Sequence, residues 1–215
     1  MAATMAKKAL RTKMKTVIGS LSQECKTAQS AAVTAKLLQL PCYQTARSVA
    51  VFLSMDDEVN TDLILEDILH SGKKCYIPKY VIDCFRCLSS YFTFARYYMK
   101  SSKMEMVRLR DRQDYRDLPV TKWNIKQPAD DDIRQEALES VDGLDLILVP
   151  GLAFTKAGAR CGRGRGYYDT YLAMSMEKQQ KPPVTVALAF NEQIVEAVPT
   201  DDHDFIINYI LAETN

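Results

Sequence analysis

The chain has 215 residues, which fits one domain and is long enough to bury a sizeable core. Its hydrophobic fraction of 47% and its charged fraction of 26% are ordinary for a soluble globular protein. The net charge of +1 excludes a global field that would attract nucleic acid or an anionic membrane, so any affinity for phosphate must be local.

The cysteines and the N-terminal segment indicate in which cellular compartment we expect the protein. Six cysteines without a secretory leader favour reduced thiols, so we expect a cytoplasmic protein. The first residues are basic and no acid precedes Glu24, which leaves a mitochondrial destination open. No apolar run approaches the length that spans a membrane.

Residues 5–40 are rich in helix-forming side chains, and Pro41 closes this segment. A break at residues 19–20 divides it into two helices. The first helix carries a basic cluster in which Lys7 and Arg11, four residues apart, share one face. By itself, such a cluster fits a solvated helix face better than a binding site.

The stretch from residue 48 to residue 78 has the order strand, loop, helix, strand. Residues 48–53 and 74–78 are apolar runs typical of buried strands, and residues 62–70 between them are helical. Such a βαβ unit indicates a parallel sheet with a right-handed crossover. Ligands of these sheets bind at the carboxyl ends of the strands, where the acidic loop with Glu58 follows the first strand.

Residues 81–98 differ from their surroundings, because aromatic residues and cysteines are dense there and acids are nearly absent. Cys84 and Cys87 form a CxxC pair. A zinc site needs more ligands, and the chain has only 2 histidines. A redox pair would open a helix after a strand, which nothing here supports. We therefore favour ordinary thiols over either role.

The second half of the chain alternates strands with loops and helices. We expect strands at residues 104–108, 144–149 and 184–190 and a short helix at residues 134–139. The single tryptophan, Trp123, lies in a charged, loop-like stretch. It either plugs the edge of the core or offers a flat face to a ring ligand.

Residues 160–169 read Arg-Cys-Gly-Arg-Gly-Arg-Gly-Tyr-Tyr-Asp and are poorly suited to packing a core. Glycines offer exposed backbone N–H groups and positive φ, and arginines offer guanidinium forks, so together they suit phosphate oxygens. Residues 166–174 have helical spacing, so the glycines lead into a helix N-terminus that favours an anion. The alternative is a solvated basic loop. The spacing matches neither a P-loop nor the dinucleotide fingerprint.

The acidic segment at residues 198–204 is rich in oxygen ligands. On composition alone, a solvated turn is the better interpretation. A functional alternative is a carboxylate that reaches a phosphate-bound Mg²⁺, because this ion is usually held by one or two carboxylates together with phosphate and water.

The chain resembles the 5-formyltetrahydrofolate cyclo-ligase family, also called 5,10-methenyltetrahydrofolate synthetases, from Lys7 to about Asp204. The blocks that carry the resemblance are residues 55–58, 150–154 (Pro-Gly-Leu-Ala-Phe) and 162–169 (Gly-Arg-Gly-Arg-Gly-Tyr-Tyr-Asp). The resemblance implies a single three-layer α/β domain over residues 1–215, with a mainly parallel, Rossmann-like sheet flanked by helices. Residues 81–98 have no counterpart in the family, and we expect them to loop out as an insertion.

The resemblance also implies a reaction: ATP- and Mg²⁺-dependent closure of 5-formyltetrahydrofolate to 5,10-methenyltetrahydrofolate, with release of ADP and phosphate. A formamide oxygen is a poor leaving group. Its phosphorylation makes an iminium-like phosphate that N10 can attack, and phosphate then leaves. Positioning and charge stabilisation dominate such a reaction, so we expect no protein nucleophile. We expect a monomer that acts on these small molecules, without nucleic acid or membrane.

Residue roles follow from the same resemblance. The ATP site takes Lys7, Lys8, Ala9, Leu10, Arg11, Arg160, Cys161, Gly162, Arg163, Gly164, Arg165, Gly166, Tyr167 and Tyr168. The folate site takes Arg11, Leu53, Glu58, Trp123, Arg163, Gly164, Arg165, Gly166 and Tyr167. The magnesium positions are Asp169 and Asp204, and the expected catalytic residues are Arg163, Arg165 and Tyr167.

Two positions depart from the family pattern. Arg165 stands where many relatives have lysine, which replaces a point charge by a fork. Asn208 stands where we expect an acid after the metal-site turn. A site disabled by these changes or by the insertion would bind folate or nucleotide without turnover. A third interpretation is RNA binding through the arginine–glycine loop, and a fourth is a sugar-phosphate isomerase or coenzyme A transferase that works without ATP.

Overall fold

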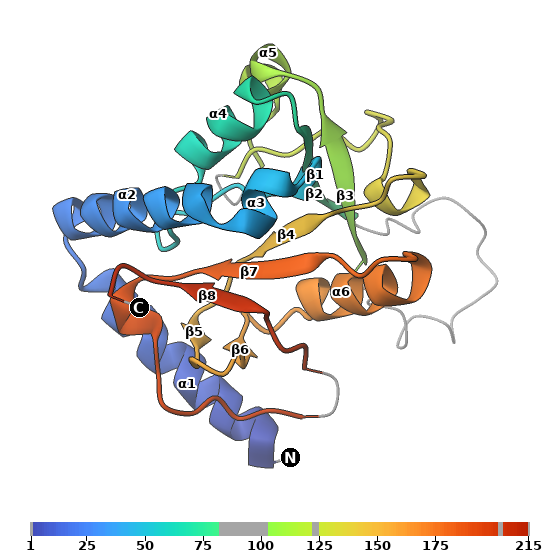
Figure 1. Cartoon of the computed structure of the whole chain (residues 1–215). Coiled ribbons are helices and arrows are strands. Elements are labelled where there is room, and N and C mark those ends of the chain that lie inside the picture. The colour runs from blue at the N-terminus through green and yellow to red at the C-terminus, as the bar shows by residue number, and fades with distance from the viewer. Residues whose placement is uncertain (1, 82–102, 122–124, 202–203, 215) are drawn as a thin grey trace, which may run out of the picture.

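The computed structural model describes residues 2–81, 103–121, 125–201 and 204–214. Within these ranges, a 6-stranded sheet runs in the order β3-β2-β1-β4-β7-β8 (Figure 1). Its strands are β1 (Ser48–Ala50), β2 (Lys74–Val81), β3 (Lys103–Leu109), β4 (Leu146–Val149), β7 (Val184–Leu188) and β8 (Tyr209–Leu211). Neighbouring strands are parallel except β2 and β3, which confirms the mainly parallel α/β sheet expected from the sequence.

Helices flank this sheet (Figure 1). They are α1 (Ala2–Gly19), α2 (Gln23–Gln39), α3 (Pro41–Thr45), α4 (Asp62–His70), α5 (Arg112–Asp117) and α6 (Tyr167–Lys178). The two helices expected within residues 5–40 are both present as α1 and α2. The side chain of Ser22 caps α2 by accepting a hydrogen bond from the backbone N–H of Cys25.

The prediction of a helix at residues 134–139 is wrong, because only a 3₁₀ turn, η2 (Ala137–Glu139), forms there. The backbone just before it is extended and pairs with β3. The N–H of Arg108 donates to the carbonyl of Gln135, and Val107 forms a bridge with Glu136. Tertiary pairing therefore overrides the local helix preference of this segment.

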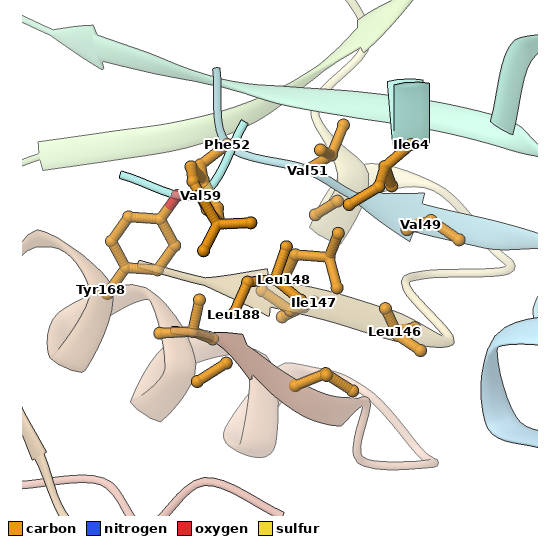
Figure 2. Close-up of a cluster of buried hydrophobic side chains, with 14 of the residues drawn as sticks. Val49, Val51, Phe52, Val59, Ile64, Leu146, Ile147, Leu148, Tyr168 and Leu188 are labelled. Carbon is orange, nitrogen blue, oxygen red and sulfur yellow. The ribbon is translucent and has the colours of Figure 1, made fainter. Parts of the chain in front are cut away.

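The central strands are buried at every position, as the continuous apolar runs predict. Figure 2 shows side chains that follow β1, such as Val51, close to Ile147 and Leu148 of β4 and Ile64 of α4. Strands without a solvent face need cover on both sides, which the flanking helices supply as outer layers. Each large side chain buried here contributes about 1.5–3 kcal/mol.

The order of the strands places a switch point beside β1. From β1 the chain crosses over through α4 to β2, and later it returns on the other side of β1 as β4. The loops that follow β1 and β4 therefore leave the sheet at neighbouring carboxyl ends. In open α/β sheets, a ligand crevice forms at this position.

β2 extends through Val81, the first residue of the expected insertion, and Val81 pairs with Lys103 of β3. The rest of segment 81–98 lies outside the described residues, and so does Trp123. Along the described parts of the chain, no helix has both the length and the apolarity needed to cross a bilayer.

Candidate active site

The predicted loop of glycines and arginines follows a short hairpin, β5 (Ala153–Phe154) and β6 (Arg160–Cys161), and leads directly into α6. Gly164 and Gly166 have φ of 95° and 72°, a left-handed backbone that favours glycine. Gly166 is the N-cap of α6 and supplies no side chain to its first N–H groups. This loop with its helix start has the geometry that we expected for an anion site.

Arg163 reaches from this loop to the acidic loop after β1. Its Nε lies 3.1 Å and its Nη2 lies 3.0 Å from Oε1 of Glu58. Its Nη1 and Nη2 also donate to Asp57, over 3.0 Å to Oδ2 and 2.5 Å to Oδ1. The structure thus brings together Glu58 and Arg163, two of the positions assigned to folate. Asp57, which that assignment leaves out, shares the same guanidinium.

The carboxyl group of Glu58 is largely shielded from water. Burial raises the pKa of Glu58, and the charge of Arg163 offsets only part of this effect. Its second oxygen accepts a hydrogen bond of 3.0 Å from the backbone N–H of Met55. Leu53, the other substrate position at this end of β1, is buried.

An aromatic pair lies near the same carboxylate. The rings of Tyr80 and Tyr167 are tilted against each other, with centroids 4.8 Å apart. Burial, together with the negative charge of Glu58, raises the pKa of Tyr80. Tyr80 was missed at the sequence level. The signal that could have found it is its position at the carboxyl end of β2, because ligands of parallel sheets bind at the carboxyl ends of the strands.

Helix α1 contacts the other side of the glycine loop. Nε of Arg11 donates a hydrogen bond of 2.8 Å to the carbonyl oxygen of Gly162. Gly164 faces the same guanidinium, since a Cβ there would come within 3.3 Å of Arg11. Of the other N-terminal residues assigned to ATP, Lys8 and Ala9 are exposed and Leu10 is half-buried. The structure therefore places part of the predicted N-terminal segment at the loop.

Lys7, on the same helix, binds the C-terminal acidic segment. Its Nζ lies 2.8 Å from Oδ2 of Asp201 and 2.6 Å from Oδ2 of Asp204. Burial lowers the pKa of Lys7, but hydrogen bonds to Asp201 and Asp204 outweigh it, so the pKa is raised overall. The predicted ATP residue Lys7 and the predicted metal residue Asp204 thus meet, although they come from opposite ends of the chain.

Asp169, the second predicted metal position, pairs with Arg160 over 2.5 Å. Arg160 is buried and also donates to the carbonyl oxygen of Pro150 over 3.2 Å. Its Nε and the hydroxyl of Tyr168 are buried without a hydrogen-bond partner among the described residues. Burial raises the pKa of the neighbouring Cys161 thiol, while the charges of Arg11, Lys7 and Arg160 oppose this shift.

Across the ranges that the structure describes, no three Asp, Glu, His or Cys side chains gather into a metal site of their own. Asp169 and Asp204 nevertheless offer carboxylate oxygens, the hard ligands that Mg²⁺ takes. Each is held by a cation of the chain. Either carboxylate fits an ion that arrives with phosphate oxygens, because magnesium sites of that kind need only one or two carboxylates.

Asn208 lies away from these groups. Its Oδ1 accepts hydrogen bonds of 2.8 Å from both the backbone N–H and the hydroxyl of Thr185. Thr185 is near the amino end of β7, whereas the candidate site lies at carboxyl ends. Asn208 therefore joins β7 to the segment before β8, and the departure from the family pattern there does not alter the site directly.

Sheet, switch point and glycine loop together define an α/β protein with a candidate anion-binding site. The model of the 5-formyltetrahydrofolate cyclo-ligase family matches residues 3–213, and the chain belongs to this family of enzymes. The family resemblance drawn from residues 55–58, 150–154 and 162–169 is thereby confirmed.

Individual relatives agree with this family. The chain is 43% identical over 208 residues to the 5-formyltetrahydrofolate cyclo-ligase of Mus musculus, covering 97% of this chain and 94% of that protein. It is 31% identical to a probable 5-formyltetrahydrofolate cyclo-ligase of Caenorhabditis elegans, covering 96% and 92%. The structure of Aquifex aeolicus 5,10-methenyltetrahydrofolate synthetase has a TM-score of 0.71 at 24% identity, covering 97% of this chain and 90% of that chain. That likeness supports the fold.

Proposed function

We propose that this protein converts 5-formyltetrahydrofolate and ATP to 5,10-methenyltetrahydrofolate, ADP and phosphate. The observation that carries the proposal is the meeting of three distant segments at one edge of the sheet. Arg163 of the glycine loop contacts Glu58, and Arg11 of α1 contacts Gly162. These segments carry the residues that the family resemblance assigns to folate and to ATP.

The folate end would lie between the acidic loop and the aromatic pair. Glu58, held in place by Arg163, can accept hydrogen bonds from the N–H donors of a pterin ring. The rings of Tyr80 and Tyr167 offer aromatic surface next to it. This arrangement would hold the formyl group and N10 in place while the glycine loop presents the nucleotide.

The phosphate end would lie over the glycine loop and the start of α6. No side chain caps the backbone N–H groups at the start of α6, so these groups are open to an anion. Arg165 is exposed and has no partner among the residues that the structure describes, so its fork is available to phosphate. Arg163 and Arg165 would stabilise charge on the transferring phosphoryl group.

The chemistry balances without a protein nucleophile. The formyl oxygen attacks the terminal phosphorus of ATP, and ADP leaves. N10 then attacks the activated carbon and loses its proton, and the formyl oxygen departs with phosphate, which can take up that proton. The protein's part is to align the oxygen, the phosphorus and N10 and to stabilise charge, in a site that excludes competing water.

Magnesium belongs to the same proposal. Asp169 and Asp204 would hold it, and a bound ion would neutralise phosphate charge during the transfer. Lys7 and Arg160, which now pair with these carboxylates, would then be free to contact phosphate oxygens. We place the reaction in the cytoplasm and expect the chain to act as a monomer.

The test is a direct assay. The protein is mixed with 5-formyltetrahydrofolate, Mg²⁺ and ATP, and the near-ultraviolet absorbance of the methenyl product is followed. We expect product only when ATP and Mg²⁺ are both present. Ligand binding without product would favour a binding protein that does not turn over.

Two exposed arginines give the assay a matched control. Arg165→Ala should lower kcat/KM by roughly 10²-fold or more, the usual effect of losing one charge-stabilising donor. Arg47 is also exposed but lies before the amino end of β1, at the opposite end of the sheet. Arg47→Ala should leave kcat/KM unchanged, and equal losses in both variants would remove Arg165 from the site.

A further inference from the structure

The guanidinium of Arg163 is occupied on two edges. Its Nε–Nη2 edge faces one oxygen of Glu58, and its Nη1–Nη2 edge takes both oxygens of Asp57. A guanidinium has five N–H donors, and these contacts use four of them. An arginine assigned to phosphate is therefore already engaged by carboxylates of the chain itself.

The two carboxylates differ in how firmly they need this arginine. The side chain of Glu58 is only 8% exposed, so loss of Arg163 would leave a buried charge uncompensated. The side chain of Asp57 is 33% exposed and can be solvated by water instead. We therefore expect the contact of Arg163 with Glu58 to persist when a ligand binds, and its contact with Asp57 to be the one that a ligand replaces.

Asp57 contacts Arg163 in the same geometry that a bound phosphate or carboxylate ligand would adopt. Its two oxygens lie 3.0 Å and 2.5 Å from Nη1 and Nη2, the bidentate arrangement in which arginine holds a carboxylate or a phosphate. Within the glycine loop, Arg163 lies between Gly162 and Gly164, and Gly164 has φ of 95°. Any oxyanion that takes this edge of Arg163 must first displace Asp57.

We propose that Asp57 determines the affinity of the site for phosphate-bearing ligands, by acting as an internal anion that competes for Arg163. This inference rests on the proposed function, which places a nucleotide at the glycine loop. When a second group occupies the binding edge, the apparent dissociation constant rises in inverse proportion to the fraction of molecules in which the edge is free. Removal of the competing charge should therefore tighten nucleotide binding, with Glu58 still held by Arg163.

Isothermal titration with a non-hydrolysable ATP analogue and Mg²⁺ tests this inference. Asp57→Asn should bind the analogue about three- to fivefold more tightly than the wild type, because a partly exposed ion pair is worth up to about 1 kcal/mol. Asp56→Asn is the matched control. Asp56 carries the same charge one residue away, is exposed, and its carboxylate makes no hydrogen bond or ion pair within the described parts of the chain. It should change affinity less than twofold.

A second arm ties the gain to Arg163. In an Arg163→Ala background, Asp57→Asn should give no gain, because no guanidinium is left to compete for. Weaker binding by Asp57→Asn, or a gain equal to that of Asp56→Asn, would overturn the inference alone and leave the proposed function intact. Absence of binding by every variant and the wild type would overturn the proposed function and this inference with it. Asp57→Ser provides a second variant if Asp57→Asn does not fold.

Discussion

At the scale of single residues, Arg160 is the most constrained cation of the candidate site. Its side chain is only 4% exposed, and it donates to Asp169 and to the carbonyl oxygen of Pro150. Its Nε has no hydrogen-bond partner among the described residues. A buried guanidinium with one donor already unpaired depends strongly on the remaining carboxylate.

Asp169→Asn should lower the free energy of unfolding by about 1–3 kcal/mol, because it removes the carboxylate charge that compensates buried Arg160. Urea denaturation of both proteins measures the difference. Asp142→Asn is the matched control, since Asp142 forms a half-exposed ion pair with Lys74. That substitution should cost at most about 1 kcal/mol. Equal losses in the two variants would show that burial of Arg160 adds nothing.

At the scale of elements, α5 is short and has no buried residue, so it depends on polar contacts for its position. Asp114 in α5 accepts hydrogen bonds of 2.7 Å from both Nη1 and Nη2 of Arg134. Arg134 also donates to the carbonyl oxygen of Arg108 in β3 over 3.0 Å. This nearly buried arginine ties α5 to the edge of the sheet.

Asp114→Asn should lower the free energy of unfolding by about 1–3 kcal/mol at neutral pH, because it removes the charged acceptor of two hydrogen bonds from Arg134. Burial raises the pKa of Asp114, but hydrogen bonds from Arg134 and Arg110 outweigh it, so the pKa lies below its ordinary value of 3.8. A carboxyl with a depressed pKa stabilises the fold above that ordinary value and loses this effect as the pH falls through its folded value. Urea denaturation at pH 7 and at a series of decreasing pH values below 3.8 should show the difference and its progressive loss.

A control for this element lies on the same helix. Arg112 of α5 pairs with Glu66 of α4 over 3.4 Å, and both side chains are more than half exposed. Glu66→Gln should therefore change the free energy of unfolding by less than about 1 kcal/mol. A difference for Asp114→Asn that persists at low pH would contradict the assigned role of its charge.

The elements also show what sequence patterns can predict. The apolar run of β4 and the glycines before α6 have direct physical causes in the residues themselves, and both predictions are confirmed. The segment before η2 pairs with a distant strand, which no local propensity reveals. Asp57 was missed for a similar reason, because its role depends on an arginine of another loop.

At the scale of the whole molecule, the candidate site is assembled from segments that only the topology brings together. Lys7 stands in the first helix and Asp204 near the end of the chain, yet they form an ion pair. The family resemblance assigned Lys7 to ATP and Asp204 to magnesium, whereas charge and spacing alone left each as a solvated group. The switch point between β1 and β4 brings separate charged loops to neighbouring carboxyl ends of the sheet.

The same topology sets an expectation for segment 81–98. β2 and β3 are antiparallel neighbours, and Val81 and Lys103 are partners in register. Deletion of residues 82–98 would leave residues 99–102 as the connection, which is within the usual length of a hairpin loop.

We therefore predict that the shortened protein folds, with a Tm within about 4 °C of the full chain. Its kcat for methenyl product should be unchanged, because the groups of the candidate site lie on other segments. Thermal unfolding and the absorbance assay measure both properties. Insoluble protein, or soluble protein without activity, would show that the segment belongs to the working fold.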